Sequence, residues 1–329
     1  MQENAKKFNF KTAFGKYGIV VMFILLYIVL AILIPGFVSA SNIEGILVQG
    51  SIYGIMALGV TFIIISGGTD LSAGSNVAMS ATILGIAGQT ADAQNRIWAA
   101  FPSMGVWGAL AVGIIVGGLL GALNGWMIAK LNIFPFIATL GTYTIYRGLS
   151  LVITGGSAVS GLSEGFKTVG GHLGVIPTPV LVFVICIIVA LILLNYTRFG
   201  CNVYALGGNR SAARVSGVNI QKTLILIYML AGIFYGIAAW VYAGRVLSIN
   251  AGVAKRYEMT AISCSIIGGT NPAGGKGAIW GVVVGTLIIS TIRYGLTLLA
   301  VDAYWQQIAE GLIIVVAVII AMLQSGDKK

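Results

Sequence analysis

Charged residues are scarce in this sequence. Asp, Glu, Lys and Arg make up 9% of its 329 residues, whereas a water-soluble domain carries about 25%. This deficit excludes a soluble globular protein, and the 58% share of hydrophobic residues suits a lipid bilayer. Because a helix of about 20 residues crosses the hydrocarbon core, the chain has room for about ten spans with short loops. A single membrane anchor attached to a soluble catalytic domain is excluded.

Residues for catalysis, redox chemistry and metal binding are also few. The 3 cysteines are far apart and form no C-x-x-C motif, so they predict neither a disulfide framework nor a metal site. The one histidine, His172, has no Cys or carboxylate at metal-ligand spacing. Lys276 follows glycines, but a phosphate-binding loop would need glycine where Thr270 stands. The sequence therefore predicts no enzyme activity, no metal site and no cofactor bound by this chain.

Glycine is plentiful, with 46 residues against 6 prolines. In one apolar run, small residues recur at every fourth position: Ala109, Gly113, Gly117, Gly121 and Gly125. Such a ladder lets two helix backbones approach closely in lipid. We expect it to pack against another helix of the same chain, and a dimer contact is the alternative.

Apolar runs bounded by charged or turn residues predict the membrane spans. They cover residues 18–34, 45–66, 72–90, 105–128, 136–153, 180–197, 223–243, 257–269, 277–292 and 305–323. Most Lys and Arg residues fall on the loops of the side that carries both termini, which places that side in the cytoplasm. We therefore predict an all-α polytopic membrane protein of about ten transmembrane helices. A single transmembrane domain over 18–323 would lie between cytoplasmic tails at 1–17 and 324–329.

Ionisable residues in or beside the spans are candidates for function, because burying a charge in hydrocarbon is costly. Asp70 precedes Ser72, so its carboxylate either caps the next helix or belongs to a gate. Arg147 lies near the end of a span, where it either snorkels or hydrogen-bonds a polar solute. Asp70, Arg147 and Glu258 are the candidate pathway or gate residues, and Glu310 is a further acid in a span. A cation-coupled transporter would need several acids near mid-membrane, and no such cluster is visible.

Two glycine-rich turns resemble each other, GGTDLSAG at 67–74 and GGTNPAGG at 268–275. Each ends one apolar run and begins the next. Paired glycines break a helix, and the freed backbone groups then need protein or water partners inside a membrane. Broken helices of this kind often mark pathways in transporters. Both turns fall on the predicted cytoplasmic side, so they do not indicate an inverted repeat.

A basic cytoplasmic loop, RFGCNVYALGGNRSAARVSGVNIQK, covers residues 198–222. Asn209 and Ser211 are candidate N-caps of a short helix at 212–215, which Gly217 would end. Such a helix is too short to be stable without a partner. The pattern fits either a docking helix or a solvated basic loop.

Within this loop, ALGGNRSAARVSGVNI is similar to the coupling segment of permease subunits of bacterial ABC importers for sugars of the ribose/galactose type. The resemblance spans nearly the whole chain and includes SGGTDLSAGS at 66–75, LNGWMIAKLNIFPFIATLGTYTIYRG at 123–148, GRVLSINAG at 244–252, YEMTAISCSIIGGTNPAGGKGAIWG at 257–281 and YGLTLLAVDAYWQQIAEGLIIVVAV at 294–318. GTDLSAG, LNIFPFIATLGT and YWQ most resemble the galactose/methyl-galactoside branch. Thr260 departs from the family pattern YELDAIA, because an acidic residue usually stands there.

The resemblance implies a bacterial inner-membrane, multi-pass homodimer with ten spans around a central pathway for a monosaccharide. Its partners would be two cytoplasmic ATP-binding subunits, which carry ATP and Mg, and a periplasmic sugar-binding protein, with no role for nucleic acid. The implied ATPase-coupling residues are Gly207, Gly208, Asn209, Arg210, Ser211, Ala212, Ala213, Arg214, Val215, Ser216, Gly217, Val218 and Asn219. They would form the helix that the ATPase receives in a cleft.

Two alternatives remain open at this point. A secondary transporter or facilitator would act alone and would depend on an ion gradient or on none. A related ABC permease would keep the same machinery for another solute, such as ribose, nucleosides or branched-chain amino acids.

Overall fold

Helices account for most of the chain, of which the computed structural model describes residues 10–326. The helices are α1 (Phe10–Leu33), α2 (Ala40–Ile65), α3 (Ala73–Gly88), α4 (Gly105–Lys130), α5 (Pro135–Thr154), α6 (Gly165–Gly170), α7 (Thr178–Asn195), α8 (Arg198–Gly208), α9 (Arg210–Val215), α10 (Ile220–Val246), α11 (Tyr257–Ile267), α12 (Ile279–Leu298) and α13 (Ala303–Gly326). Between α6 and α7, β1 (His172–Leu173) and β2 (Ile176–Pro177) form an antiparallel hairpin. The predominantly helical fold class predicted from the sequence is confirmed.

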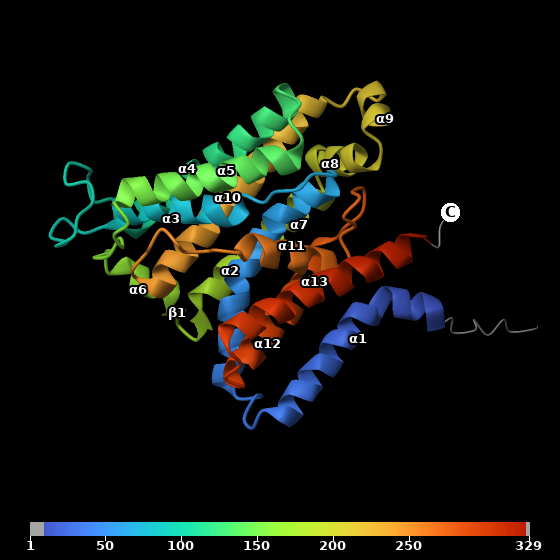
Figure 1. Ribbon diagram of the computed structural model, residues 1–329, viewed down its shortest axis with the longest axis horizontal. Coiled ribbons are helices and arrows are strands. Elements are labelled where there is room, and N and C mark those ends of the chain that lie inside the picture. Colours follow the sequence, from blue (N-terminus) through green and yellow to red (C-terminus); the bar gives the residue numbers. More distant parts are fainter. Residues whose placement is uncertain (1–9, 327–329) are drawn as a thin grey trace, which may run out of the picture.

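Helix α2 forms the centre of the molecule (Figure 1). Its residues are buried without interruption from Gly50 to Ile65, and it contacts α7, α10, α11 and α12. A helix that is apolar on every side is stable in a protein only where other helices enclose it. The remaining elements are therefore arranged around α2.

Helices α4 and α10 pack with their backbones in contact along the predicted glycine ladder. A Cβ atom on Gly121 would collide with the carbonyl oxygen of Tyr228, and one on Gly117 would collide with that of Gly232. Any side chain larger than hydrogen would force the two helices apart. The expectation that this ladder packs inside the chain is confirmed.

Bulky apolar side chains cover the surface of the outer helices. On α7, five of them are between 42% and 53% exposed: Val184, Ile185, Ile188, Val189 and Ile192. A surface of this kind marks contact with a membrane or another protein, because water would not tolerate a large continuous apolar patch. The chain is a multi-pass membrane protein whose most enclosed helix, α2, lies inside this apolar shell.

Six helices of the described residues are long and apolar enough to cross a membrane, namely α2, α4, α5, α7, α10 and α12. Helix α1 adds a shorter apolar stretch over Val20–Leu33. With 16 and 11 residues, α3 and α11 are too short to cross a core of about 30 Å alone. Each predicted span contains a helix, while the count of about ten crossings and the cytoplasmic side of the termini stay predictions.

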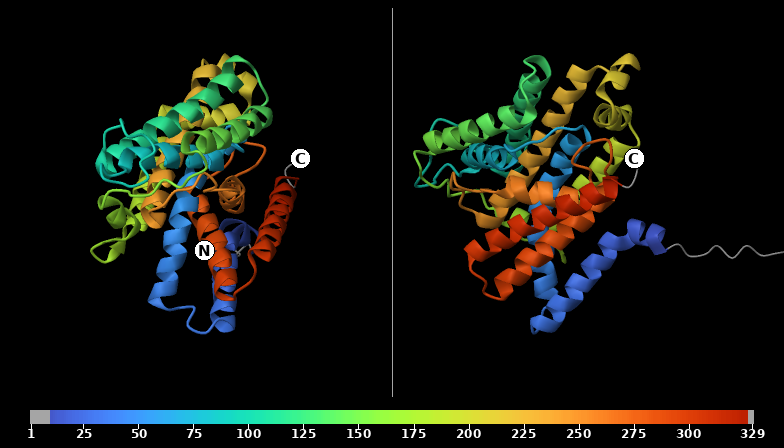
Figure 2. Two further views of the ribbon diagram at one scale, coloured as in Figure 1. Left: turned by 60° about the vertical axis from the view of Figure 1, so that its left-hand side comes forward. Right: turned by 45° about the vertical axis from the view of Figure 1, so that its right-hand side comes forward.

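The predicted tails overlap helices at both ends of the chain. Helix α1 begins inside the predicted tail at 1–17, and α13 ends inside the predicted tail at 324–329. Polar and aromatic residues continue a helix beyond the apolar run, so the end of the run does not mark the end of the helix. The remaining parts of these tails, 1–9 and 327–329, lie outside the described residues. Both terminal helices lie on the side of the molecule away from α4 and α5 (Figure 2).

Candidate coupling segment and polar centre

The predicted coupling segment folds into two helix ends and one short helix. Gly207 and Gly208 end α8, and α9 covers only Arg210–Val215. Asn219 caps the start of α10, because its side-chain oxygen accepts a backbone N–H at 2.9 Å. The implied single helix over 207–219 is wrong, since the extended backbone of Asn209 separates α8 from α9. The predicted helix end at Gly217 agrees with its φ of +85°.

One of the two predicted N-caps is confirmed. Asn209 Oδ1 accepts the backbone N–H of Ala212 at 2.9 Å, which makes Asn209 the N-cap of α9. Ser211 lies inside α9, so its assignment as a cap is wrong. The reason is that α9 begins two residues earlier than the alanine pair suggested, and the cap is the residue just before the first helical one.

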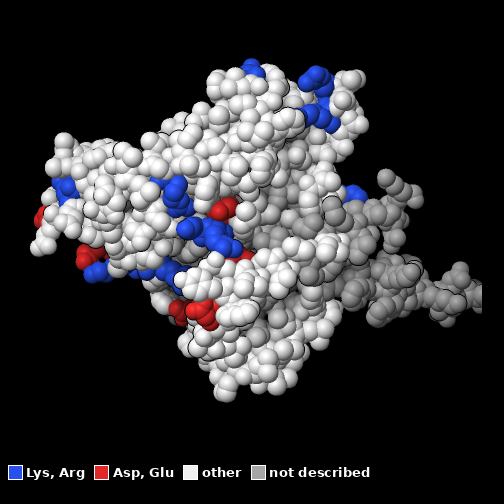
Figure 3. Space-filling view, viewed as in Figure 1, with Lys and Arg blue, Asp and Glu red and all other residues white. Residues whose placement is uncertain are grey.

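Helix α9 projects from the body of the molecule (Figure 1). Val215 is 89% exposed, whereas Ala213 is only 4% exposed and faces the protein. Arg210 and Arg214 are exposed, and Figure 3 shows basic side chains over the corner that α9 occupies. The segment therefore offers an exposed cationic surface carrying one large apolar side chain.

The two similar glycine-rich turns lie side by side, although about 200 residues separate them. The Gly275 N–H donates to the carbonyl oxygen of Ile65 at 2.8 Å. A Cβ atom on Gly274 would lie 3.0 Å from the Cα of Gly67. The end of α8 joins them, because a Cβ on Gly207 would lie 2.6 Å from Gly275 N. We call Gly67, Gly207, Gly274 and Gly275 the glycine junction.

Asp70 is buried, with 2% of its surface exposed, in the segment between α2 and α3. Its Oδ1 accepts the backbone N–H of Ser72 at 2.8 Å and the Ser72 hydroxyl at 2.6 Å. Its Oδ2 accepts the hydroxyl of Tyr235 on α10 at 3.0 Å. The N-cap of α3 is Ser72 itself, so Asp70 fixes the cap residue rather than acting as the cap. A gating role for Asp70 stays a prediction.

Arg147 on α5 holds the segment that leads into α11. It donates to the carbonyl oxygens of Ala251 and Val253, at 2.8 and 2.6 Å. Its guanidinium lies 6.0 Å from the centroid of the Tyr143 ring, within the range of a cation–π contact. Its Nη2 is buried and has no hydrogen-bond partner in the described part of the chain.

Glu258 lies in the first turn of α11 and is 5% exposed. Its Oε2 presses against Gly74 in the first turn of α3, where an added Cβ atom would collide with it. This oxygen also lacks a hydrogen-bond partner among the described residues. The three candidates therefore gather around the starts of α3 and α11, and we call Asp70, Arg147 and Glu258 the polar centre.

A second polar cluster, which sequence reasoning missed, joins α11, α12 and α13. The Thr260 hydroxyl donates to Glu310 Oε1 at 2.5 Å and accepts from Arg293 Nη1 at 3.1 Å. Arg293 Nη2 lies 3.4 Å from Glu310 Oε2, and its guanidinium is 5.0 Å from the Tyr53 ring centroid. Glu310 thus places a carboxylate beside position 260, where the resemblance leads one to expect an acid. The signal was available, since an Arg at the end of one apolar run and a Glu within the next are costly unless they are paired.

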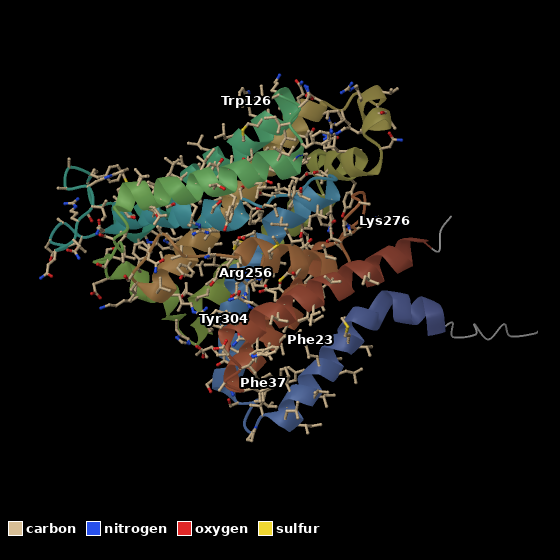
Figure 4. The ribbon with its side chains drawn as sticks, viewed as in Figure 1. Phe23, Phe37, Trp126, Arg256, Lys276 and Tyr304 are labelled. Atoms are coloured by element: carbon tan, nitrogen blue, oxygen red, sulfur yellow. The ribbon has the colours of Figure 1, made fainter. Side chains whose placement is uncertain are left out.

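Metal ligands do not cluster in the described part of the chain, where no group of three or more His, Cys, Asp or Glu residues could hold a metal ion. His172 lies in β1, and its Nε2 is 2.9 Å from Glu44 Oε1. Both side chains are nearly half exposed, so this pair is a surface contact. Arg256, labelled in Figure 4, donates to Gln307 Oε1 at 2.5 Å and adds another contact between the α11 region and α13.

The glycine junction, the projecting α9 and the polar centre occur in a chain that matches a known family. The family model described as branched-chain amino acid transport system / permease component matches residues 42–319. The chain belongs to this permease family.

Curated relatives of the permease cover almost its full length. The galactose/methyl galactoside import permease protein MglC of Escherichia coli strain K12 is 38% identical, with 98% of each chain covered. The MglC of Haemophilus influenzae is 39% identical over 94% of this chain and 95% of its own. The ribose import permease protein RbsC of Bacillus subtilis is 36% identical over 99% of this chain and 98% of its own. No solved structure matches the permease significantly.

Proposed function

We propose that this permease is the membrane-spanning subunit of an ATP-driven importer that moves a monosaccharide into the bacterial cytoplasm. The observation that carries the proposal is its full-length similarity to galactose/methyl galactoside and ribose import permeases. In this proposal two copies form a homodimer in the inner membrane around a central pathway. A periplasmic sugar-binding protein delivers galactose, a methyl galactoside or a related sugar to the outer opening.

The energy comes from partner subunits that bind ATP and Mg, and this chain binds no cofactor. The projecting α9 supports this assignment. The outward surface of α9 carries the exposed Arg210, Arg214 and Val215, and such a surface suits the cleft of another protein. Closure of the ATPase subunits would move α9 and alternate the access of the pathway between the two sides of the membrane.

Recovery of the partner tests the proposed machinery most simply. The tagged permease, solubilised from its native membranes in a mild detergent, is expected to bring an ATP-binding subunit at about one per permease chain, because each copy presents one α9. Reproducible absence of that subunit in several mild detergents would contradict the proposal and favour a stand-alone transporter.

A substitution on the exposed face of α9 tests the docking surface without disturbing the fold. Val215 is 89% exposed, so Val215→Glu is expected to abolish recovery of the ATP-binding subunit while the permease stays in the membrane. Ala213 is buried, and a large residue there would disturb the protein itself before any docking. Tyr196→Phe, which changes an 82% exposed side chain elsewhere, is the control. Full recovery of the partner with Val215→Glu would contradict the docking assignment.

Ribose is the second candidate substrate, because the ribose import permease of Bacillus subtilis aligns over 99% of the chain. The two cargoes are separated by titrating the cognate periplasmic protein with galactose and with ribose, and by competing each sugar against uptake. Binding of galactose alone would support the galactose assignment. Binding of ribose alone would keep the importer and change its cargo.

A further inference from the structure

The glycine junction brings three separate segments into direct backbone contact. A Cβ atom on Gly207 would collide with the carbonyl oxygen of Ile65 and lie 2.6 Å from Gly275 N. One on Gly274 would lie 3.0 Å from the carbonyl oxygen of Gly207 and 3.0 Å from the Cα of Gly67. With no side chain between these backbones, none of the segments has room to shift without moving the others.

Hydrogen bonds also connect the three segments, which are the end of α2, the end of α8 and the loop after α11. The Gly275 N–H donates to the end of α2 at Ile65, at 2.8 Å. The hydroxyl of Tyr204, on α8, donates to the carbonyl oxygen of Gly277 at 2.7 Å. The end of α8, the end of α2 and the loop after α11 are therefore bonded as well as packed (Figure 4, where Lys276 labels the loop).

The junction is adjacent to the coupling segment along the chain. Helix α8 ends at Gly208, and the single residue Asn209 separates it from α9. Asn209 N–H donates back to Ala205 at 3.0 Å while its side chain caps α9. A displacement of α9 thus reaches Gly207 through one residue that is hydrogen-bonded to both helices.

The two glycine-rich turns connect the junction to the polar centre. The segment 67–74 begins at the junction with Gly67 and ends with Gly74 against Glu258. Helix α11 begins with Glu258 in its first turn and leads at its other end into the turn 268–275. The segment 67–74 and α11 therefore run between the same two places, and movement at one end of α11 has two routes to the other, one along α11 itself and one along the segment that packs against both of its ends.

We propose that the glycine junction is the transmission point of this permease, at which movement of α9 passes into both glycine-rich turns and through them to the polar centre. The inference rests on the proposed function, because it assumes that a partner moves α9. It assigns Gly207 as a positioning residue whose lack of a side chain allows the direct contact. Only glycine fits at this position, because the Cβ atom of any other residue would collide with the carbonyl oxygen of Ile65.

The test compares Gly207→Ala with glycine-to-alanine changes that meet open space. Gly141, on α5, and Gly208 have no atom within 4 Å of an added Cβ. Each variant is reconstituted in liposomes with the ATP-binding subunit and the sugar-binding protein. Partner recovery, ATP hydrolysis and sugar uptake are then measured on the same preparations. The parent chain is the reference for the proposed function: uptake without ATP in the parent would remove that function, independently of the variants.

We expect Gly207→Ala to retain the ATP-binding subunit and to lose about tenfold in uptake, with ATP hydrolysis no longer stimulated by the loaded binding protein. Gly141→Ala is expected to match the parent, and Gly208→Ala to lose less than Gly207→Ala. Uptake by Gly207→Ala at the parent rate would overturn the proposal. A fall in uptake that only matches a loss of bound partner would also overturn it.

If Gly207→Ala does not reach the membrane in a folded form, a milder variant tests the proposal instead. Tyr204→Phe removes only the hydroxyl that donates to Gly277 and leaves the packing of the ring. It is expected to lower uptake about threefold at unchanged partner recovery. Loss of one hydrogen bond at the junction would weaken the coupling between movement of α9 and movement of the glycine-rich turns. Unchanged uptake by Tyr204→Phe would overturn the proposal.

Discussion

The two ends of α11 are held in different ways. At its C-terminal end, the glycine junction joins three backbones with no side chain between them. At its N-terminal end, the carboxylate of Glu258 packs against Gly74 of α3, and the nearby Thr260 hydrogen-bonds charged side chains of α12 and α13. Backbones packed this closely fit together in only one way, whereas charged side chains can exchange hydrogen-bond partners. Under the proposed transmission, the end with fixed backbone contacts would pass movement on and the end with charged side chains would respond to it.

The orphaned oxygens and nitrogens support this difference. Glu258 Oε2 and Arg147 Nη2 are buried without hydrogen-bond partners among the described residues. A buried group of this type is costly and needs an explanation. If the permease alternates between two arrangements, as proposed above, these atoms would be available for a partner in the other one.

The largest loss of stability is expected from a substitution in the glycine junction. Gly274→Ala is expected to lower the free energy of unfolding by about 3 kcal/mol, because the backbone strain of a positive φ adds to tight contacts of 3.0 Å with the backbones of Gly67 and Gly207. Gly36, with a similar φ of +74°, has nothing within 4 Å of an added Cβ. Gly36→Ala is therefore the matched control and should cost about 1 kcal/mol. Detergent-induced unfolding followed by tryptophan fluorescence measures both, and equal losses would contradict the packed junction.

The next largest loss of stability is expected from breaking the Arg293–Glu310 ion pair near the N-terminal end of α11. Arg293→Met is expected to cost about 2 kcal/mol, because it leaves Glu310, which is 5% exposed, without its cation. Adding Glu310→Gln should recover at least half of the loss, since the amide oxygen still accepts from Thr260 without carrying a charge. The same unfolding assay provides the measurement. A double variant less stable than Arg293→Met would show that the pair is not replaceable and would weaken the comparison.

A smaller effect is expected at the polar centre. Tyr235→Phe removes the hydroxyl that donates to Asp70 Oδ2 at 3.0 Å and should cost about 1 kcal/mol. Tyr196→Phe, at an 82% exposed position, serves as the control and should leave stability unchanged. A loss with Tyr235→Phe no greater than that of the control would show that Asp70 does not depend on this bond.

The smallest change is expected from removing the N-cap of α9. Asn209→Ala removes a cap worth about 1 kcal/mol, so backbone exchange within α9 should quicken about fivefold with little change in overall stability. Ser211→Ala is the control, because Ser211 lies inside the helix. Hydrogen exchange followed by mass spectrometry measures the backbone exchange rate of α9 in both variants. Faster exchange in Ser211→Ala than in Asn209→Ala would reverse the cap assignment.

Local chemistry accounts for what the sequence could predict. The four-residue repeat of small residues indicated the α4 contact, and Asn209 before an alanine-rich stretch indicated a cap. These features depend on neighbours within a few turns of one helix. The exact helix ends were less predictable, because the helical run does not stop where hydropathy falls.

Contacts between distant segments could not be predicted in the same way. The likeness of the two glycine-rich turns was visible, but nothing in one sequence shows that Gly67 and Gly274 touch. The grouping of Thr260 with Arg293 and Glu310 likewise needs the positions of three helices. Pairing of costly buried charges gives a reason to look for such clusters, while only the fold identifies the partners.

Sugar uptake by reconstituted liposomes tests the central claim most directly. The permease is combined with the ATP-binding subunit and the sugar-binding protein, and uptake of labelled galactose or ribose is followed with and without ATP. The account predicts that uptake requires ATP, the binding protein and the ATP-binding subunit together. Uptake by the permease alone, without nucleotide, would contradict it.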